Sequence, residues 1–421
     1  MKRGSGHRYQ VDISGGKGAV VGDYATVFQV FAQSPPALSS FIRAPQFRSL
    51  VDERVRKFVG RDFVFKRIEQ LIGGAEFQSG YVTVRGEPGI GKTAIAASLV
   101  ARHGYVHHFN IAPQNIRSPR QFLENVCAQL IVRYELKYTT LPPAASEDAG
   151  FLSQLLSECS DRAREMGNAP VVVVVDALDE SENRELPASA NCLYLPRALP
   201  DGVFFILTTR EKADYRLDVD NESEIWIREN DPGNQKDVIK YIERFVETDA
   251  NNMAAPLNEW GLTRKAFVAE LATLAEGNFM YLVHVLPEIA RGRLRKQTVG
   301  AIDALPRGLK SYYQRHWRDM KAADETRFAT LQRPVLCFLA ISREPVTVIE
   351  LVQWTNLEPG DVMGVIREWR EFLNDDGTSA ACYRIYHRSF AEFLDEEENL
   401  RFYHDRIGQT ALAKLPGLLM G

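Results

Sequence analysis

The residues best suited to chemistry in this 421-residue chain form a glycine-rich loop. Its sequence GEPGIGKT fits the pattern G-x-x-x-x-G-K-[ST], in which backbone N–H groups turn inward around phosphates. An apolar stretch precedes the loop and a helical one follows, so the positive end of that helix would face the phosphates. We predict that Lys92 reaches the β- and γ-phosphates of a nucleotide and that the Thr93 hydroxyl ligates Mg²⁺. The predicted phosphate-binding residues are Gly86, Glu87, Pro88, Gly89, Ile90, Gly91, Lys92, Thr93 and Ala94.

A second group of candidate residues follows the valine run of the segment VVVVVDALDE. Asp176 stands at the end of this apolar run, where a carboxylate would lie beside the phosphate loop and hold Mg²⁺ through water. Phosphoryl transfer needs a positioned nucleophile, so either Asp179 or Glu180 is a candidate to orient the attacking water. The alternative is that both are solvated acids of a loop.

Arg210 ends another apolar run, VFFILTTR. A guanidinium at that position could contact a γ-phosphate through bidentate hydrogen bonds. The alternative is an ion pair on the protein surface.

These residues need a sheet to bring them together, and the sequence from about residue 51 to 225 alternates between strand and helix patterns. Five consecutive valines are typical of a strand buried on both faces, as in the interior of a parallel sheet. We therefore predict an α/β fold, a doubly wound parallel sheet of the P-loop type. The predicted strands are 81–85, 105–111, 171–175 and 203–208, and the predicted helices are 92–101, 119–134 and 150–166.

Three further segments flank this predicted domain. Residues 1–50 read as a glycine-rich lead-in, too short for a full effector domain. Its run Gly15–Gly18 lacks the spacing of a phosphate loop, and short strands and turns are favoured instead. In residues 226–304 apolar positions recur at helical spacing, which predicts a small helical domain. Residues 305–421 predict further helices and a hairpin around Asp376-Gly377, which together favour a winged-helix domain.

Composition narrows the classes of function. The chain has 51 basic and 55 acidic residues, a formal charge of −4, which gives no general reason to bind nucleic acid or an anionic membrane. The polar start lacks the apolar core of a signal peptide, and no apolar stretch approaches membrane-spanning length. The five cysteines form no CxxC pair, so we expect neither zinc nor a disulfide framework but a reducing, cytoplasmic setting.

Together these motifs resemble the STAND class of P-loop NTPases, and most closely its NACHT branch. The likeness is carried by Phe58-Val59-Gly60-Arg61, GEPGIGKT, DALDE and LTTR. The resemblance implies that Val59, Gly60 and Arg61 lie near the adenine and ribose. The small residue after the metal-binding aspartate, here Ala177, is distinctive of the class and makes Glu180 the better candidate for the catalytic acid.

The resemblance extends beyond the sheet. Glu276–Phe279 resembles the turn of a helical domain that closes over the nucleotide, although Phe279 stands where relatives often have proline. LPRGLKSYYQRHW and YRIYHRSFAEFL resemble the winged-helix region of bacterial NACHT-type proteins, in which His387 would contact the β-phosphate of ADP.

The resemblance thus implies a signalling or defence switch that binds ATP or ADP with Mg²⁺, hydrolyses ATP slowly and self-associates through the ATPase domain. Effector and sensor functions would reside in other segments or partner proteins. The main alternative is a DNA-associated ATPase of the replication-initiator type. Its recognition helix should be basic, whereas residues 358–376 carry two basic and six acidic residues. A catalytically inactive scaffold is also disfavoured, because the lysine, threonine and acid cluster are intact.

Overall fold

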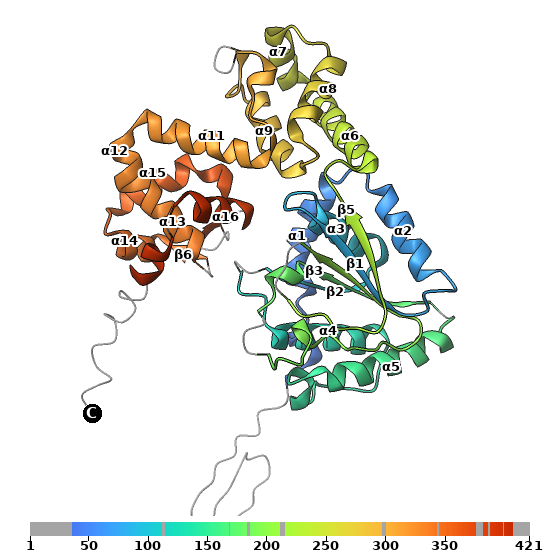
Figure 1. Cartoon of the computed structure of the whole chain (residues 1–421). Helices are drawn as coiled ribbons and strands as arrows, with labels where there is room; N and C mark the ends of the chain where they lie inside the picture. The colour runs from blue at the N-terminus through green and yellow to red at the C-terminus, as the bar shows by residue number, and fades with distance from the viewer. Residues whose placement is uncertain are drawn as a thin grey trace, which may run out of the picture.

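The computed structural model describes residues 36–406, apart from 112–113, 168, 183–185, 211–214, 297–299, 343–344, 376–381, 386–387 and 399. The predicted lead-in strands and the Gly15–Gly18 run lie outside the described residues. Figure 1 shows three lobes in chain order: a sheet flanked by helices, a helical lobe containing α6 to α9, and a C-terminal lobe containing α11 to α16.

The first lobe is built on a five-stranded parallel sheet, which confirms the predicted α/β parallel-sheet fold. Four of its strands match the predicted ones closely. The fifth, β5, was missed because only Ile225 and Ile227 are buried in it and its apolar run is just three residues long, after a polar first half. In spatial order the strands are β2 (Val106–Phe109), β3 (Val171–Asp176), β4 (Val203–Thr209), β1 (Gly80–Gly86) and β5 (Glu222–Ile227).

The valine run of β3 shows why both faces of the sheet are covered. Val171, Val173 and Val175 pack in one apolar cluster with α4 and α5, whereas Val172 and Val174 pack in another with α1, α2 and α3. This alternation follows from the two-residue repeat of a strand. The helices are α1 (Ala44–Arg56), α2 (Asp62–Ile72), α3 (Lys92–His103), α4 (Pro119–Arg133) and α5 (Ala149–Glu165).

The helical lobe follows β5 directly and stands over the carboxyl ends of the strands (Figure 1). Thr263 and Asn278 each cap the helix that follows them with a side-chain oxygen. The helices are α6 (Pro232–Thr248), α7 (Ala250–Trp260), α8 (Arg264–Ala275) and α9 (Phe279–Ala290).

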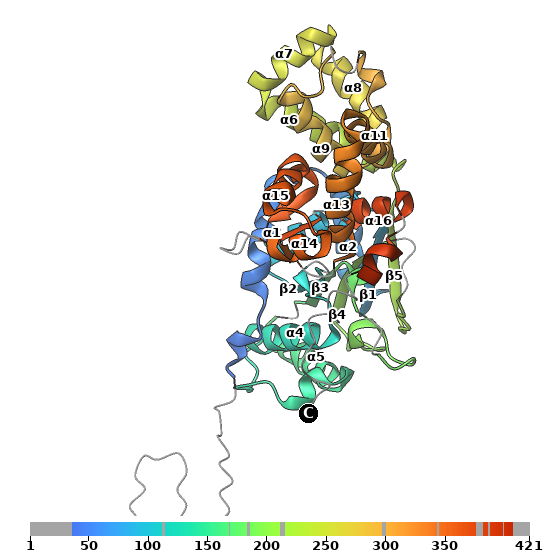
Figure 2. The same ribbon diagram turned by 90° about the vertical axis from the view of Figure 1, so that its left-hand side faces the viewer.

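The C-terminal lobe lies beside the sheet domain and below the helical lobe in Figure 1, and in front of the sheet in Figure 2. A small antiparallel sheet of order β6-β8-β7 accompanies its helices. β7 and β8 pair in the register Leu373 to Ile385, as the hairpin prediction requires, although its turn lies outside the described residues. The elements are α11 (Gly308–Ala323), α12 (Glu325–Arg327), a π-helical turn (Phe328–Gln332), α13 (Arg333–Ile341), β6 (Val346–Thr347), α14 (Val348–Thr355), α15 (Pro359–Glu368), β7 (Leu373–Asp375), β8 (Cys382–Ile385) and α16 (Arg388–Glu397).

Two of the predicted domain boundaries fall inside secondary structure. The boundary after residue 50 cuts α1, and the boundary after residue 225 cuts β5. Among the described residues no helix is both long and apolar enough to traverse a bilayer. Short 3₁₀ turns complete the fold at Leu38–Ser40, Pro143–Ser146, Leu178–Glu180, Cys192–Tyr194, Ile302–Ala304 and Arg370–Phe372.

Candidate nucleotide-binding site

The predicted phosphate loop connects β1 to α3 at the carboxyl edge of the sheet. Gly89 (φ +82°) and Gly91 (φ +100°) have left-handed backbone conformations that favour glycine. A Cβ added at Gly89 would lie 2.5 Å from Oδ1 of Asn278, so the loop can approach α9 only with glycine there. The Lys92 ammonium lies across the loop and donates to the carbonyl oxygens of Gly86 (2.7 Å) and Glu87 (3.0 Å).

The electrostatics around Lys92 suit it to an anionic ligand. The pKa of Lys92 is lowered to about 8, chiefly by burial and also by the nearby charge of Arg210, although the charges of Asp179 and Asp176 partly oppose the shift. A cation with too little negative charge around it is stabilised when phosphate oxygens arrive.

Asp176 ends β3 and is 2% exposed. Its Oδ1 accepts a hydrogen bond from the Thr208 hydroxyl at 2.5 Å, and the Thr93 side chain also bonds to this carboxyl. Burial raises the pKa of Asp176, and these two hydrogen bonds oppose the rise. A hydroxyl and a carboxylate side by side are oxygen ligands of the kind that Mg²⁺ takes, so Thr93 and Asp176 fit the predicted metal site.

The chain turns sharply after Asp176. Ala177 has φ +55°, a left-handed conformation that is uncommon for a residue with a side chain, and its N–H donates to the Thr208 hydroxyl at 2.9 Å. The 3₁₀ turn Leu178–Glu180 follows and brings Asp179 and Glu180 to the wall of the cleft. The Asp179 side chain is only 7% exposed, so Asp179 is not a solvated loop acid, whereas Glu180 lines the cleft and is half-buried.

Arg210 follows β4, the strand that lies between β1 and β3. Its Nε lies 3.0 Å from Oδ2 of Asp179, and its Nη1 lies 2.5 Å from Oε1 of Glu392 in α16. Burial alone would lower the pKa of Arg210, but the hydrogen bond and charge of Glu392 together with the acids of the turn raise it. Arg210 therefore forms ion pairs with a buried acid of the cleft and with a partly exposed acid of the C-terminal lobe.

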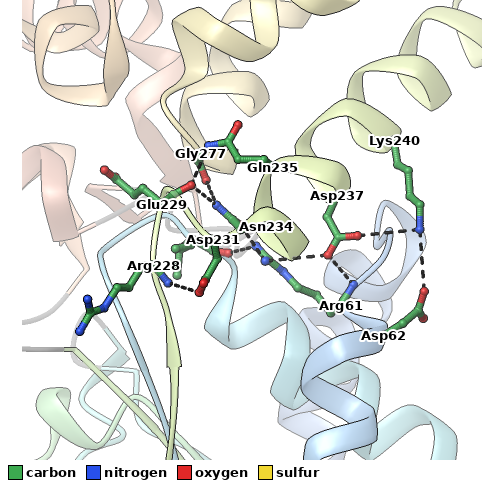
Figure 3. Close-up of polar contacts among 11 residues, drawn as sticks. Arg61, Asp62, Arg228, Glu229, Asp231, Asn234, Gln235, Asp237, Lys240 and Gly277 are labelled. Atoms are coloured by element: carbon green, nitrogen blue, oxygen red, sulfur yellow. Dashed lines mark hydrogen bonds and ion pairs between the residues drawn. The ribbon is translucent and has the colours of Figure 1, made fainter.

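Arg61 joins the sheet domain to the helical lobe (Figure 3). Its backbone N–H donates to Oδ2 of Asp237 and its Nη1 donates to Oδ1 of Asn234, each at 2.7 Å. Its Nη2 donates to the carbonyl of Ile90 in the phosphate loop, and its guanidinium lies 4.6 Å from the ring centroid of Phe279. Because Arg61 is 2% exposed, burial lowers its pKa to about 10.

The start of α9 is bonded to the phosphate loop. Nδ2 of Asn278 donates to the carbonyl of Pro88 at 2.9 Å, while its Oδ1 caps α9. The N–H groups of Phe279 and Met280 donate to the carbonyl of Gly89 at 3.1 and 3.2 Å. The helical lobe is thus attached to the loop that would carry the phosphates.

A cleft of about 200 Å³ lies between these elements. Of the predicted residues, Val59, Arg61, Pro88, Gly89, Gly91, Lys92, Thr93, Ala94, Asp179, Glu180 and Arg210 line it. Asp176, Gly60, Gly86, Glu87 and Ile90 are not among the residues that line the cleft. Gly60 packs so closely on Asp237 that an added Cβ would lie 2.1 Å from its Oδ1. His387 lies outside the described residues.

Sequence reasoning missed several residues that line the cleft. Thr208 could have been found, since a polar residue at the end of an apolar strand needs a partner. Tyr241 offered no such signal because α6 reaches the cleft only in the folded chain, whereas Phe279, whose ring lies 5.5 Å from that of Tyr241, belongs to the turn that the resemblance placed over the nucleotide. The other unpredicted lining residues are Glu53, Arg54, Lys57, Phe58, Ala177, Met280 and Val283.

Comparison with known proteins agrees with this geometry. Residues 57–206 match the family model of the AAA ATPase domain. The chain contains a P-loop ATPase domain. The family match ends within β4, so Thr208 and Arg210 lie just beyond the matched part of the ATPase domain. No curated protein matches the chain.

Solved structures with similarity to the chain include two kinds of protein. A STAND protein with a tetratricopeptide repeat sensor from Pyrococcus horikoshii is 14% identical over 85% of this chain and 46% of its own, with a TM-score of 0.42. The chain therefore spans about half the length of that protein. Two point mutants of RuvB from Thermotoga maritima are 11% and 12% identical over 80% of this chain and 95% of theirs, with TM-scores of 0.28 and 0.30.

Proposed function

We propose that this chain is a nucleotide-controlled switch of the STAND class, NACHT-like in its motifs, which is closed with ADP and opens with ATP. The observation that carries the proposal is that the candidate nucleotide site is bonded to both other lobes. Asn278 of the helical lobe bonds to the phosphate loop, and Glu392 of the C-terminal lobe bonds to Arg210. A ligand in this cleft therefore acts on the contacts that hold the lobes together.

A switch requires that the two nucleotides differ in how they affect these contacts, because a ligand shifts an equilibrium only by its differential affinity. The β-phosphate would meet Lys92 and the loop N–H groups with either nucleotide. The γ-phosphate would add charge near Arg210 and the acids of the Leu178–Glu180 turn. The presence of this one group would thus decide between the two arrangements.

The same residues support slow hydrolysis. Thr93 and Asp176 would hold Mg²⁺, which when bound supplies positive charge to the phosphates. Glu180, on the wall of the cleft, would orient the attacking water. Asp179 is paired with Arg210, so it is less suited to that role in this arrangement.

The C-terminal lobe supports the finer proposal of a winged helix. Its chain order is α13, β6, α14, α15, β7 and β8, with β8 between β6 and β7 in the sheet. In DNA-binding modules built on a recognition helix, that helix carries cations to phosphates. The acidic balance of residues 358–376 instead favours a role in protein contacts.

The proposal extends to the setting of the protein. We place it in the cytoplasm as a signalling or defence protein that self-associates through its ATPase domain. Its effector output and its sensor input would come from segments or partners other than those described.

The decisive experiment is mass analysis of the nucleotide that co-purifies with the protein, with the Lys92→Ala variant as the control. We expect tightly held ADP in the parent and none in the variant. A parent that holds no nucleotide and binds neither ADP nor ATP in calorimetric titration would contradict the switch. Sequence-specific duplex DNA binding by the full chain at physiological salt would support the initiator-type alternative instead.

A further inference from the structure

Arg210 is shared by two carboxylates that belong to different lobes. Asp179 lies in the turn after β3, whereas Glu392 lies 182 residues after Arg210 in α16. The Arg210 and Asp179 side chains are 15% and 7% exposed, so that ion pair is buried in the cleft, whereas the Glu392 side chain is 42% exposed and reaches Arg210 from the C-terminal lobe. A guanidinium offers its N–H donors in a fixed fork, and here different nitrogens of that fork face different acids.

Arg210 is also within electrostatic reach of the phosphate loop. Its charge is one of the causes that lower the pKa of Lys92, and both residues line the cleft. β4, which ends immediately before Arg210, is held to Asp176 by the Thr208 hydroxyl. The guanidinium thus stands on the side of the cleft where the metal and terminal phosphate would lie.

Glu392 is held in place by the packing of its helix. Phe390 and Phe393 on either side of it are buried against Tyr313, with ring centroids 5.1 and 5.7 Å apart. The Tyr313 hydroxyl also lies 3.0 Å from the Ser389 hydroxyl. Because α16 is fixed to α11 in this way, Glu392 can move away from Arg210 only if the C-terminal lobe moves with it.

We propose that Glu392 is a specificity-determining residue that makes the closed site select ADP over ATP, by competing with the γ-phosphate for Arg210. ADP has no group to compete with, so it leaves the Arg210–Glu392 ion pair intact. The γ-phosphate of ATP meets an occupied guanidinium and a second negative charge, which repels it. By reciprocity, ATP weakens the docking of the C-terminal lobe by the same factor as docking weakens ATP binding.

The inference rests on the proposed nucleotide switch, and one substitution tests it. Glu392→Gln in the full chain removes the charge and keeps the size of the side chain. We expect the affinity for a non-hydrolysable ATP analogue to rise relative to that for ADP by about 5- to 10-fold. This is the lower part of the range typical of coupled sites, because Glu392 is partly exposed.

Glu396→Gln is the matched control. Glu396 lies one turn further along α16 and pairs with Lys310 at 2.5 Å, on the exposed surface. The Glu396→Gln substitution breaks an ion pair of the same helix outside the cleft, so the ratio of ATP-analogue to ADP affinity should stay at the parent value. If Glu392→Gln fails to fold, Glu392→Asp takes its place. Its side chain is one methylene shorter, so the affinity ratio should shift in the direction expected for Glu392→Gln.

Competition titration against a fluorescent ADP analogue measures both affinities in each variant. A folded Glu392→Gln protein that binds both nucleotides with the parental ratio would overturn the role of Glu392 while leaving the switch intact. A parent protein that binds neither nucleotide would instead overturn the proposed function.

Discussion

At the scale of single residues, the depressed pKa of Lys92 gives nucleotide binding a dependence on pH. In the free protein this pKa is about 8, and phosphate oxygens raise it, so above pH 8 binding must take up a proton. We expect the affinity for ADP to fall as pH rises above about 8, by up to tenfold per pH unit.

Calorimetric titrations between pH 7 and 9.5, in buffers with different ionisation enthalpies, measure both the affinity and the proton uptake. Affinity that stays constant across this range, with no proton uptake, would show that Lys92 is fully charged in the free protein.

Also at the residue scale, the two acids of the Leu178–Glu180 turn differ in their surroundings. Asp179 pairs with Arg210, whereas Glu180 is the proposed partner of the attacking water. Glu180→Gln should keep the affinity for ATP and reduce turnover on the order of 10²-fold or more. A steady-state assay with Asp179→Asn beside it checks the assignment, and Glu180→Gln turnover at the parental rate would transfer the role to another group.

At the scale of elements, the helix α9 is attached to the phosphate loop by its own cap. Asn278 accepts from the N–H groups of Met280 and Tyr281 and donates to the Pro88 carbonyl. Asn278→Ala should reduce the free energy of unfolding by about 1–3 kcal/mol, because it removes a cap and a buried hydrogen bond. It should also weaken ADP binding by roughly tenfold, because the loop loses its support.

Thr263→Ala provides the comparison for this effect. Thr263 caps α8 through the N–H of Ala266 and is not among the residues that line the cleft. Its loss should lower stability by about 1 kcal/mol and leave ADP affinity unchanged. Thermal unfolding and titration of both variants separate the two effects, and equal affinity losses would mean that general loosening, rather than the Asn278–Pro88 bond, controls the loop.

At the scale of the whole molecule, the site contacts all three lobes, so the exchange of ADP for ATP should change the oligomeric state of the protein. We expect light scattering to find a monomer with ADP and a larger assembly with a non-hydrolysable ATP analogue. Lys92→Ala, which should bind neither nucleotide, should give the same mass under both conditions. A parent protein of constant mass with both nucleotides bound would remove self-association from the proposal.

The sequence by itself determined the parts of the site that depend on local pattern. The place of the phosphate loop between a strand and a helix, the place of Asp176 at the end of β3, and four of the five sheet strands were predictable, because glycine spacing and buried apolar runs act over a few residues. Strand β5 was not, since it buries only two side chains and its apolar run is just three residues long.

Only the tertiary structure decided how the other lobes meet the loop. The bond from Asn278 to Pro88 spans 190 residues, and the ion pair from Arg210 to Glu392 spans 182. Such contacts depend on how α9 and α16 pack, and no local preference for helix or strand specifies that packing. The phosphate loop can therefore be predicted from the sequence, whereas the contacts through which the nucleotide would control the lobes depend on the tertiary structure.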